Sequence, residues 1–187
     1  MITSVTLSEA IRNAKNNNAC DESIEEIEKF NDWDEFLNHE NAAFWLYWYV
    51  VYVIKDRWYE AEEYIMKNAN MAYCYAINII NDRWYEAEEY IMKDAEWAYP
   101  YVNCIIKSRW IDAEEYIMKD SEMAYRYAKN IIKDRWIVAE KYIMKEPEWA
   151  YNYARFVIKG RWYEAEEYIM KDSEWWFEYN NDFINKL

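Results

Sequence analysis

Residues 82–107 read DRWYEAEEYIMKDAEWAYPYVNCIIK, and this stretch decides the fold because the chain repeats it. Lightly changed copies begin at Asp56, Ser108, Asp134 and Gly160, at a constant spacing of 26 residues without insertion or deletion. A fixed period of this length is typical of a tandem array in which each unit packs on its neighbours. Such an array specifies an architecture strongly and a chemistry weakly. We number these copies full repeats one to five.

The composition and the spacing of apolar residues predict two helices in each repeat. One Gly and two Pro in 187 residues are too few for the turns of an all-β protein. Trp84, Ala87 and Ile91 lie at i, i+3 and i+7, which predicts a first amphipathic helix. A broad apolar face over residues 97–106 predicts a second helix between neighbouring helices. The predicted fold class is all-α: an α-solenoid of short two-helix repeats, with about 14 helices and a cap at each end.

Polar residues set the expected helix starts. The first residue of each repeat is Asp, Ser or Gly, so we expect it to cap a first helix that begins at the following Arg. Pro147 stands where the second helix of repeat four should begin. Pro100 lies inside a predicted second helix, where we expect a mild kink. The residues expected to cap the other second helices are Asn68, Asp94, Asp120 and Asp172.

The remaining sequence divides into one continuous domain of three parts. Residues 1–30 do not match the repeat and are predicted to form an N-terminal helical cap, with Thr6 and Glu9 at capping-box spacing. Residues 31–55 form a degenerate repeat, which contains His39 in the connection between its helices. Residues 56–187 hold the five full repeats, the last of which we expect to act as the C-terminal cap.

Charge and cysteine usage narrow the function classes. The formal net charge is -14, which argues against direct nucleic-acid binding because a polyanion would be repelled. Three scattered cysteines without CxxC spacing indicate free thiols in a reducing, cytoplasmic compartment. The longest apolar stretch, residues 42–54, is too short and too rich in Tyr and Trp to span a bilayer, and we find no targeting segment.

No motif for chemistry is found in the sequence. One His and three separated Cys cannot close a zinc site, and Gly160 alone cannot form a glycine-rich phosphate loop. Carboxylates recur in every copy, and no copy departs from the others to create a distinct pair of acids. We therefore predict no catalytic residue, no metal site and no cofactor, and we expect that the protein is not an enzyme.

Residues that are identical in all five copies are best explained by packing between repeats. The recurring Trp is predicted to lie in the inter-repeat core, beside Ala and Ile. An Arg at a helix start opposes the helix dipole, so we expect it to pair with the recurring Glu in a structural ladder. The tryptophans are Trp58, Trp84, Trp110, Trp136 and Trp162; the arginines are Arg57, Arg83, Arg109, Arg135 and Arg161; the glutamates are Glu62, Glu88, Glu114, Glu140 and Glu166.

A second set of acids is predicted to form an outward acidic face of two columns. The ordinary interpretation is a solvated face with Glu–Lys pairs, and the alternative is a regular negative surface that occupies the nucleic-acid groove of a basic partner. In repeat four, Val138 and Lys141 replace the usual acids. The acidic face consists of Glu60, Glu63, Glu86, Glu89, Asp112, Glu115, Glu164 and Glu167.

Variation between copies concentrates on one stripe of the second helix. In repeats three and four this stripe becomes basic and aromatic, with Arg126, Lys129, Arg155 and Phe156. Variable exposed stripes on constant frames are where repeat proteins keep the choice of partner. We therefore predict a partner-binding region that contains these four residues together with Val138 and Lys141.

The string KGRWYEAEEYIMKDSEW, residues 159–175, resembles RW-x-EAE / YIMKD-x-EWA repeats of large bacteriophages and related viruses, most of which have no assigned function. The resemblance covers residues 56–187 and implies a viral origin and a helical-hairpin architecture. It supplies no catalytic residues. A phage origin favours a small acidic protein that blocks a host defence enzyme in the host cytoplasm.

Three functions therefore stay open. The leading hypothesis is a protein–protein interaction repeat protein, encoded by a phage, that binds and inhibits a host antiviral defence protein. The first alternative is an acidic nucleic-acid mimic that occupies the DNA or RNA site of a host nuclease. The second is a viral structural or assembly scaffold. The sequence does not decide the oligomeric state.

Overall fold

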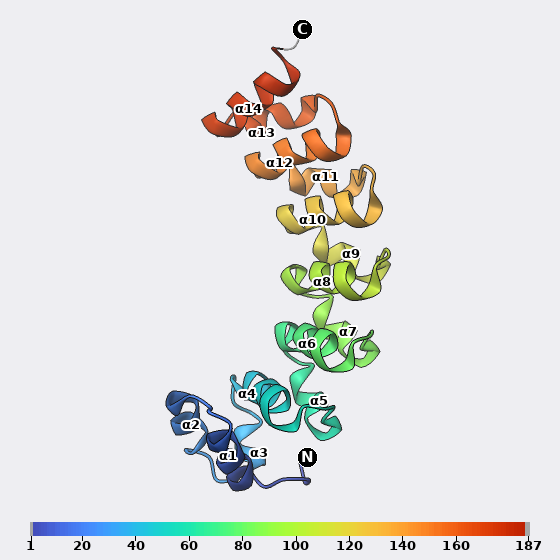
Figure 1. Ribbon diagram of the computed structural model, residues 1–187. Coiled ribbons are helices and arrows are strands. Elements are labelled where there is room, and N and C mark those ends of the chain that lie inside the picture. Colours follow the sequence, from blue (N-terminus) through green and yellow to red (C-terminus); the bar gives the residue numbers. More distant parts are fainter. Residues whose placement is uncertain (1, 186–187) are drawn as a thin grey trace. The chain divides into compact units, whose positions relative to one another are not determined.

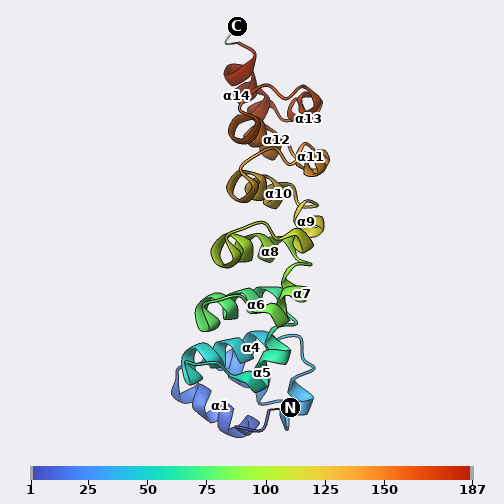
Figure 2. The same cartoon turned by 90° about the vertical axis from the view of Figure 1, so that its right-hand side faces the viewer.

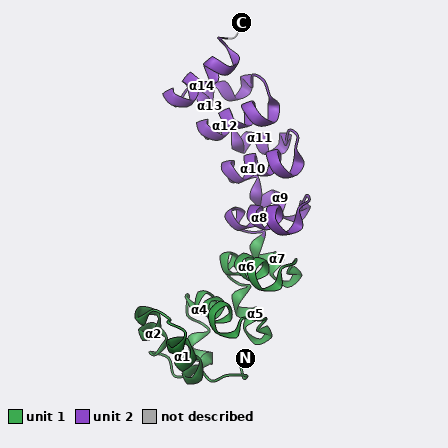
Figure 3. Ribbon diagram, viewed as in Figure 1, with its two compact units in different colours: residues 1–91 green, residues 92–187 purple. Residues whose placement is uncertain are grey.

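The computed structural model describes residues 2–185, and all regular secondary structure within them is helical (Figure 1). Its α-helices are numbered α1 to α14, and they pack in successive pairs. The predicted all-α repeat fold is confirmed. The chain divides into two compact units, residues 1–91 and 92–187 (Figure 3). That the array forms one continuous domain stays a prediction.

Unit 1 contains the predicted N-terminal cap, the degenerate repeat and the start of the full repeats. The side chain of Thr6 accepts the N–H of Glu9, and the Glu9 side chain binds back, so the predicted capping box is confirmed. His39 lies in the connection after α3, with its ring 5.3 Å from that of Phe30. The elements are α1 (Leu7–Asn16), α2 (Asp21–Ile27), α3 (Trp33–Phe36), α4 (Ala42–Tyr49), η1 (Val50–Ile54), α5 (Tyr59–Ile65), α6 (Ala69–Tyr75), η2 (Ala76–Ile80), η3 (Tyr85–Ala87) and α7 (Glu88–Ile91).

Unit 2 consists of helical hairpins in two layers. Figure 2 shows α9, α11 and α13, the first helices of their repeats, on one side and α8, α10 and α12 on the other. The elements are α8 (Ala95–Tyr101), η4 (Val102–Ile106), α9 (Ile111–Ile117), α10 (Ser121–Tyr127), η5 (Ala128–Ile132), α11 (Ile137–Ile143), α12 (Pro147–Tyr153), η6 (Ala154–Ile158), η7 (Tyr163–Ala165), α13 (Glu166–Ile169) and α14 (Ser173–Phe183).

The first helix of each full repeat begins later than we predicted. Asp56 was expected to be the cap, whereas α5 begins at Tyr59 with Trp58 as its N-cap residue. The Asp56 carboxylate instead accepts the N–H of Arg57 at 2.7 Å, before the helix starts. The prediction is wrong because the N–H of Trp58 is bound by a distant hydroxyl, that of Tyr75 at 2.9 Å. The corresponding N-cap residues are Trp84, Trp110, Trp136 and Trp162.

The predicted caps of the second helices are confirmed. The side chain of Asn68 accepts the N–H of Met71 at 3.1 Å, and that of Asp120 accepts the N–H of Met123 at 2.8 Å. Asp94 and Asp172 also accept backbone N–H groups of the first turn. Pro147 occupies the first turn of α12, where its missing N–H costs no helical hydrogen bond.

Five second helices end in a π-helical turn that the sequence did not predict. These turns are η1, η2, η4, η5 and η6, and the N–H that follows each binds the carbonyl five residues earlier, as Lys107 binds Val102 at 2.7 Å. The turn occurs with and without Pro100, so proline is not its cause. The next residue adopts a left-handed conformation without being Gly; these residues are Lys55, Asn81, Lys107, Lys133 and Lys159, with φ between 56 and 60°.

Candidate protein-docking surface

A buried network of Arg, Glu, Tyr and Trp joins the two helices of a repeat. Nε and Nη2 of Arg57 donate to the two carboxylate oxygens of Glu62, both at 2.8 Å. The hydroxyl of Tyr75 donates to the same carboxylate at 3.0 Å while it accepts the N–H of Trp58. The predicted Arg–Glu ladder is confirmed. The same network recurs around Glu114, Glu140 and Glu166 in unit 2.

Burial and hydrogen bonding shift the pKa values of the Tyr and Glu side chains in this network. Tyr127 and Tyr179 have no exposed surface, and burial of each phenol raises its pKa to about 12. The guanidinium of Arg161 lowers the pKa of Glu166, with a smaller contribution from Tyr179. A buried carboxylate is stable only when its partners satisfy it, and here Arg and Tyr do so. The network is therefore a structural feature of the repeat.

The predicted tryptophan core is confirmed. Trp84 and Trp162 are each only 2% exposed, and all five tryptophans of this set are buried. The ring of Tyr75 lies 5.0 Å from that of Trp84 in the next repeat, and Tyr127 and Trp136 lie at the same separation. The same tyrosine thus joins the two helices of its own repeat through its hydroxyl and packs against the next repeat through its ring.

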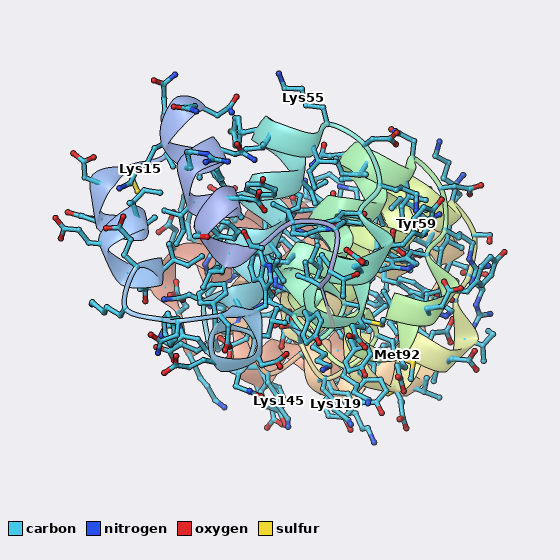
Figure 4. The ribbon with its side chains drawn as sticks, turned by 90° about the horizontal axis from the view of Figure 1, so that it is seen from below. Lys15, Lys55, Tyr59, Met92, Lys119 and Lys145 are labelled. Carbon is cyan, nitrogen blue, oxygen red and sulfur yellow. The ribbon has the colours of Figure 1, made fainter. Side chains whose placement is uncertain are left out.

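The acidic face lies on the first helices. Asp112, Glu115, Glu164 and Glu167 are exposed in unit 2, as are Glu63, Glu86 and Glu89 in unit 1. Lys119, expected to pair with these acids, lies with its Nζ 5.2 Å from the ring of Tyr116. Lys119 and Lys145 point outward at the same edge (Figure 4). That these carboxylates bind a partner stays a prediction.

Glu60 differs from the other acids of this face. Oε1 accepts the backbone N–H and the hydroxyl of Thr3 at 3.2 and 2.6 Å, and Oε2 accepts the backbone N–H of Ser4 at 3.0 Å and its hydroxyl. These hydrogen bonds lower the pKa of Glu60 to about 2, and the bond from the Ser4 hydroxyl makes the largest contribution. Glu60 therefore holds the N-terminal segment to α5.

Three predicted partner-binding residues form one cation–aromatic cluster in unit 2. The Nζ of Lys129 lies 4.2 Å from the ring centre of Phe156, and the guanidinium carbon of Arg155 lies 5.4 Å from it. Lys129 also donates to the hydroxyl of Tyr125 at 3.1 Å, and Arg155 to that of Tyr151. Phe156 is nevertheless 42% exposed. We call Lys129, Arg155 and Phe156 the Phe156 cluster.

Phe156 replaces a polar residue that joins adjacent repeats elsewhere. At the equivalent position in repeat three, Asn130 donates to the hydroxyl of Tyr99 in repeat two at 2.7 Å. Asp182, in repeat five, accepts the hydroxyl of Tyr151 at 2.9 Å. The variable stripe was predicted to be an exposed surface, but this position also contributes contacts between repeats. Among the five full repeats, only repeat four has a large apolar residue there.

The other three predicted residues do not join the Phe156 cluster. Arg126, although exposed, pairs with Glu122 one turn earlier at 2.6 Å. Val138 and Lys141 are also exposed, but they lie on α11, in the other helix layer (Figure 2). The Nζ of Lys141 lies 4.9 Å from the ring of Tyr142. The structure thus brings together three of the six residues that the sequence grouped and leaves the other three outside the cluster.

Sequence reasoning missed an exposed apolar position on the first helices. In unit 2, Ile111, Ile137 and Tyr163 are 64, 63 and 67% exposed. They directly follow the buried Trp of their repeats. An apolar residue in every copy, off the buried face of the helix, was the signal that could have identified them.

Among residues 2–185, no group of His, Cys, Asp and Glu side chains could hold a metal ion, and no helix is long and apolar enough to cross a membrane. No family model, curated protein or solved structure matches the chain.

Proposed function

We propose that the protein is a protein–protein interaction repeat protein that docks a partner on the Phe156 cluster. The observation that carries this proposal is a 42% exposed Phe156 between two cations, at a position where repeats three and five have an Asn or Asp bonded to the preceding repeat. Phe156 keeps a contact with repeat three through Lys129, but its exposed apolar surface gives the packing of the array no evident benefit. Binding a partner would supply one.

The chemistry of the cluster favours a protein partner. Aromatic residues and Arg are enriched among the residues that contribute most to binding energy, particularly where a partner excludes water from them. Lys129 adds a positive charge here on a chain whose formal charge is -14, while Arg155 also pairs with Asp182 at 3.4 Å. We therefore infer an acidic or aromatic patch on the partner, because opposite charges orient and accelerate docking.

The class of partner that we propose rests on the sequence resemblance alone. Repeats of this type resemble those of large bacteriophages, and we propose that this protein binds and inhibits a host antiviral defence protein in the host cytoplasm. The Phe156 cluster supplies the surface for this role.

The exposed acids of unit 2 support a second candidate, the nucleic-acid mimic. Asp112, Glu115, Glu164 and Glu167 all lie exposed on first helices, where they could meet a basic groove. Val138 and Lys141 interrupt this face between repeats three and five. We rank mimicry second because a continuous charge pattern is what a mimic needs.

Two matched sets of changes separate the candidates once a partner is captured from infected cells. The cluster set is Lys129→Ala, Arg155→Ala and Phe156→Asn. The acidic set is Asp112→Asn, Glu115→Gln, Glu164→Gln and Glu167→Gln. We expect the cluster set to weaken partner binding tenfold or more, about 1.4 kcal/mol, and the acidic set to leave affinity nearly unchanged.

The opposite outcome would overturn the ranking. Loss of binding in the acidic set alone, with affinity that falls steeply as salt rises, would establish mimicry. Copurification with virion proteins in place of a host protein would favour a viral scaffold. Circular dichroism of both sets checks that the helices are intact.

A further inference from the structure

An exposed aromatic stripe runs along α4 and η1 in unit 1. Phe44, Trp48 and Tyr52 are spaced by four residues and therefore lie on one face. Phe44 is 54% exposed and Tyr52 is 52% exposed, and the rings of Trp48 and Tyr52 lie 5.1 Å apart. Solvated polar residues are the ordinary occupants of such a face, so three aromatic residues there are unusual.

The full repeats provide an internal comparison for this stripe. The same three positions are almost entirely without aromatic residues in repeats one to five, and Phe156 is the one exception. The equivalents of Phe44 are Asn70, Glu96, Glu122, Glu148 and Glu174; those of Trp48 are Cys74, Pro100, Arg126, Asn152 and Glu178; those of Tyr52 are Asn78, Cys104, Asn130, Phe156 and Asp182. Packing of the array therefore does not require aromatic residues here.

Two neighbouring cavities lie beside the stripe, between α4 and α2. The larger has a volume of about 350 Å³ and is lined by Phe44, Trp45 and Trp48 together with the turn at residues 18–20 and Ser23. The smaller, of about 220 Å³, shares Ser23, Phe44 and Trp45 with it and adds Glu26. We call the two together the α2–α4 groove.

The Trp45 side chain, in the wall of this groove, contains a buried hydrogen-bond donor. The Trp45 side chain lines both cavities, and Trp45 is 5% exposed. Its Nε1–H has no acceptor among the described residues. A buried donor without an acceptor is costly and uncommon.

The negative charge beside the groove favours a positively charged ligand. Helix α2 carries Asp21, Glu22, Glu25 and Glu26 and has no basic residue. Of these, Glu26 lines the smaller cavity. Carboxylates next to exposed aromatic rings attract Lys and Arg both by charge and by cation–π contact. A second copy of this acidic chain, or a nucleic acid, would bring like charge to α2.

We propose that the α2–α4 groove binds a basic peptide segment of a partner protein. One aromatic or large aliphatic side chain of that segment fills the larger cavity, whose volume lies in the range of small-ligand pockets. Its basic residues face α2 and the rings of Phe44 and Trp48. This site lies in unit 1 and stands independently of the Phe156 cluster in unit 2.

The test selects short randomised peptides against the full chain. We expect enriched peptides to carry an excess of Lys and Arg around one large apolar residue. The variant Phe44→Glu with Trp48→Asn introduces residues that the chain itself has at equivalent positions, Glu96 and Asn152. We expect it to bind these peptides about tenfold more weakly or worse, which corresponds to about 1.4 kcal/mol. The matched control, Phe156→Asn, should bind them as the wild type does.

A second measurement uses the wild-type chain, so its result does not depend on whether a variant folds. Cys20 lines the larger cavity and is exposed, whereas Cys104 is exposed in unit 2. A selected peptide should slow alkylation of Cys20 by iodoacetamide and leave that of Cys104 unchanged. No enrichment, enriched peptides without basic residues, or equal protection of the two thiols would each overturn the proposal. So would a homodimer that the Phe44→Glu, Trp48→Asn variant abolishes, because the groove would then bind a second copy.

Discussion

Replacing Tyr127 by Phe tests whether the buried polar network stabilises the repeat. Tyr127 has no exposed surface, and its hydroxyl accepts the N–H of Trp110 at 2.8 Å while donating to Glu114 at 3.1 Å. Phe keeps the ring, so the contact with Trp136 at 5.0 Å is preserved. The change therefore removes one hydroxyl and leaves the packing between repeats unaltered.

The expected loss follows from the two hydrogen bonds. An unpaired buried N–H costs about 1–3 kcal/mol, and a hydrogen bond to a charged group contributes about 1.5–3 kcal/mol. Because one hydroxyl makes both bonds, their contributions are not additive, and we expect a combined loss of about 2–4 kcal/mol in the free energy of unfolding. Tyr163→Phe is the matched control, because Tyr163 is 67% exposed.

Urea unfolding followed by helical circular dichroism measures this difference. Since arrays can unfold in steps, amide exchange in α9 and α10 should accompany it and should become faster in the Tyr127→Phe variant. A loss below about 0.5 kcal/mol, as expected of a surface substitution, would refute the reasoning.

Four further predictions concern pH and the backbone. The folded chain keeps the protons of Tyr127 and Tyr179 to about pH 12, whereas unfolded tyrosine releases its proton near the ordinary pKa of 10.0. The stabilisation is complete below pH 10 and is lost as pH rises towards 12, which urea midpoints against pH will measure. Glu60 has a folded pKa of about 2 against an ordinary 4.5. Its contribution is therefore present above pH 4.5 and lost as pH falls towards 2, and limited proteolysis before Leu7 should then become faster in the wild type but be pH-independent in Glu60→Gln. Lys133 has a φ of 60°, so Lys133→Gly should raise the free energy of unfolding by about 0.5–1 kcal/mol. An added Cβ at Gly160 meets nothing within 4 Å, so we expect Gly160→Ala to raise the free energy of unfolding by about 0.4–1 kcal/mol. Thermal unfolding measures both backbone variants. A lower stability in either variant would contradict the assigned backbone conformation.

The sequence predicted what depends on the repeat period. The 26-residue spacing, the buried tryptophans and the caps such as Asp120 follow from patterns with one physical solution. The start of the first helix did not follow, because its N-terminal N–H binds a tyrosine from the second helix. The π-helical turn was also missed, because Lys, and not Gly, occupies the left-handed position after it in four of five cases.

The candidate site was predicted only in part. Lys129, Arg155 and Phe156 do meet, because the second helices of repeats three and four pack against each other. Val138 and Lys141 do not meet them, because a sequence cannot show which layer faces a partner. The groove beside Phe44 and Trp48 depends on the packing of α2, which follows no repeat.

The most direct test of partner docking at the Phe156 cluster is photo-crosslinking in infected cells. A benzophenone derivative of phenylalanine is placed at Phe156, and in a second sample at Tyr163, which lies exposed on the first-helix layer of unit 2. Our account predicts a covalent adduct with one host protein from the first position and none from the second. An adduct from Tyr163 alone would contradict it and move the docking surface to the acidic first helices.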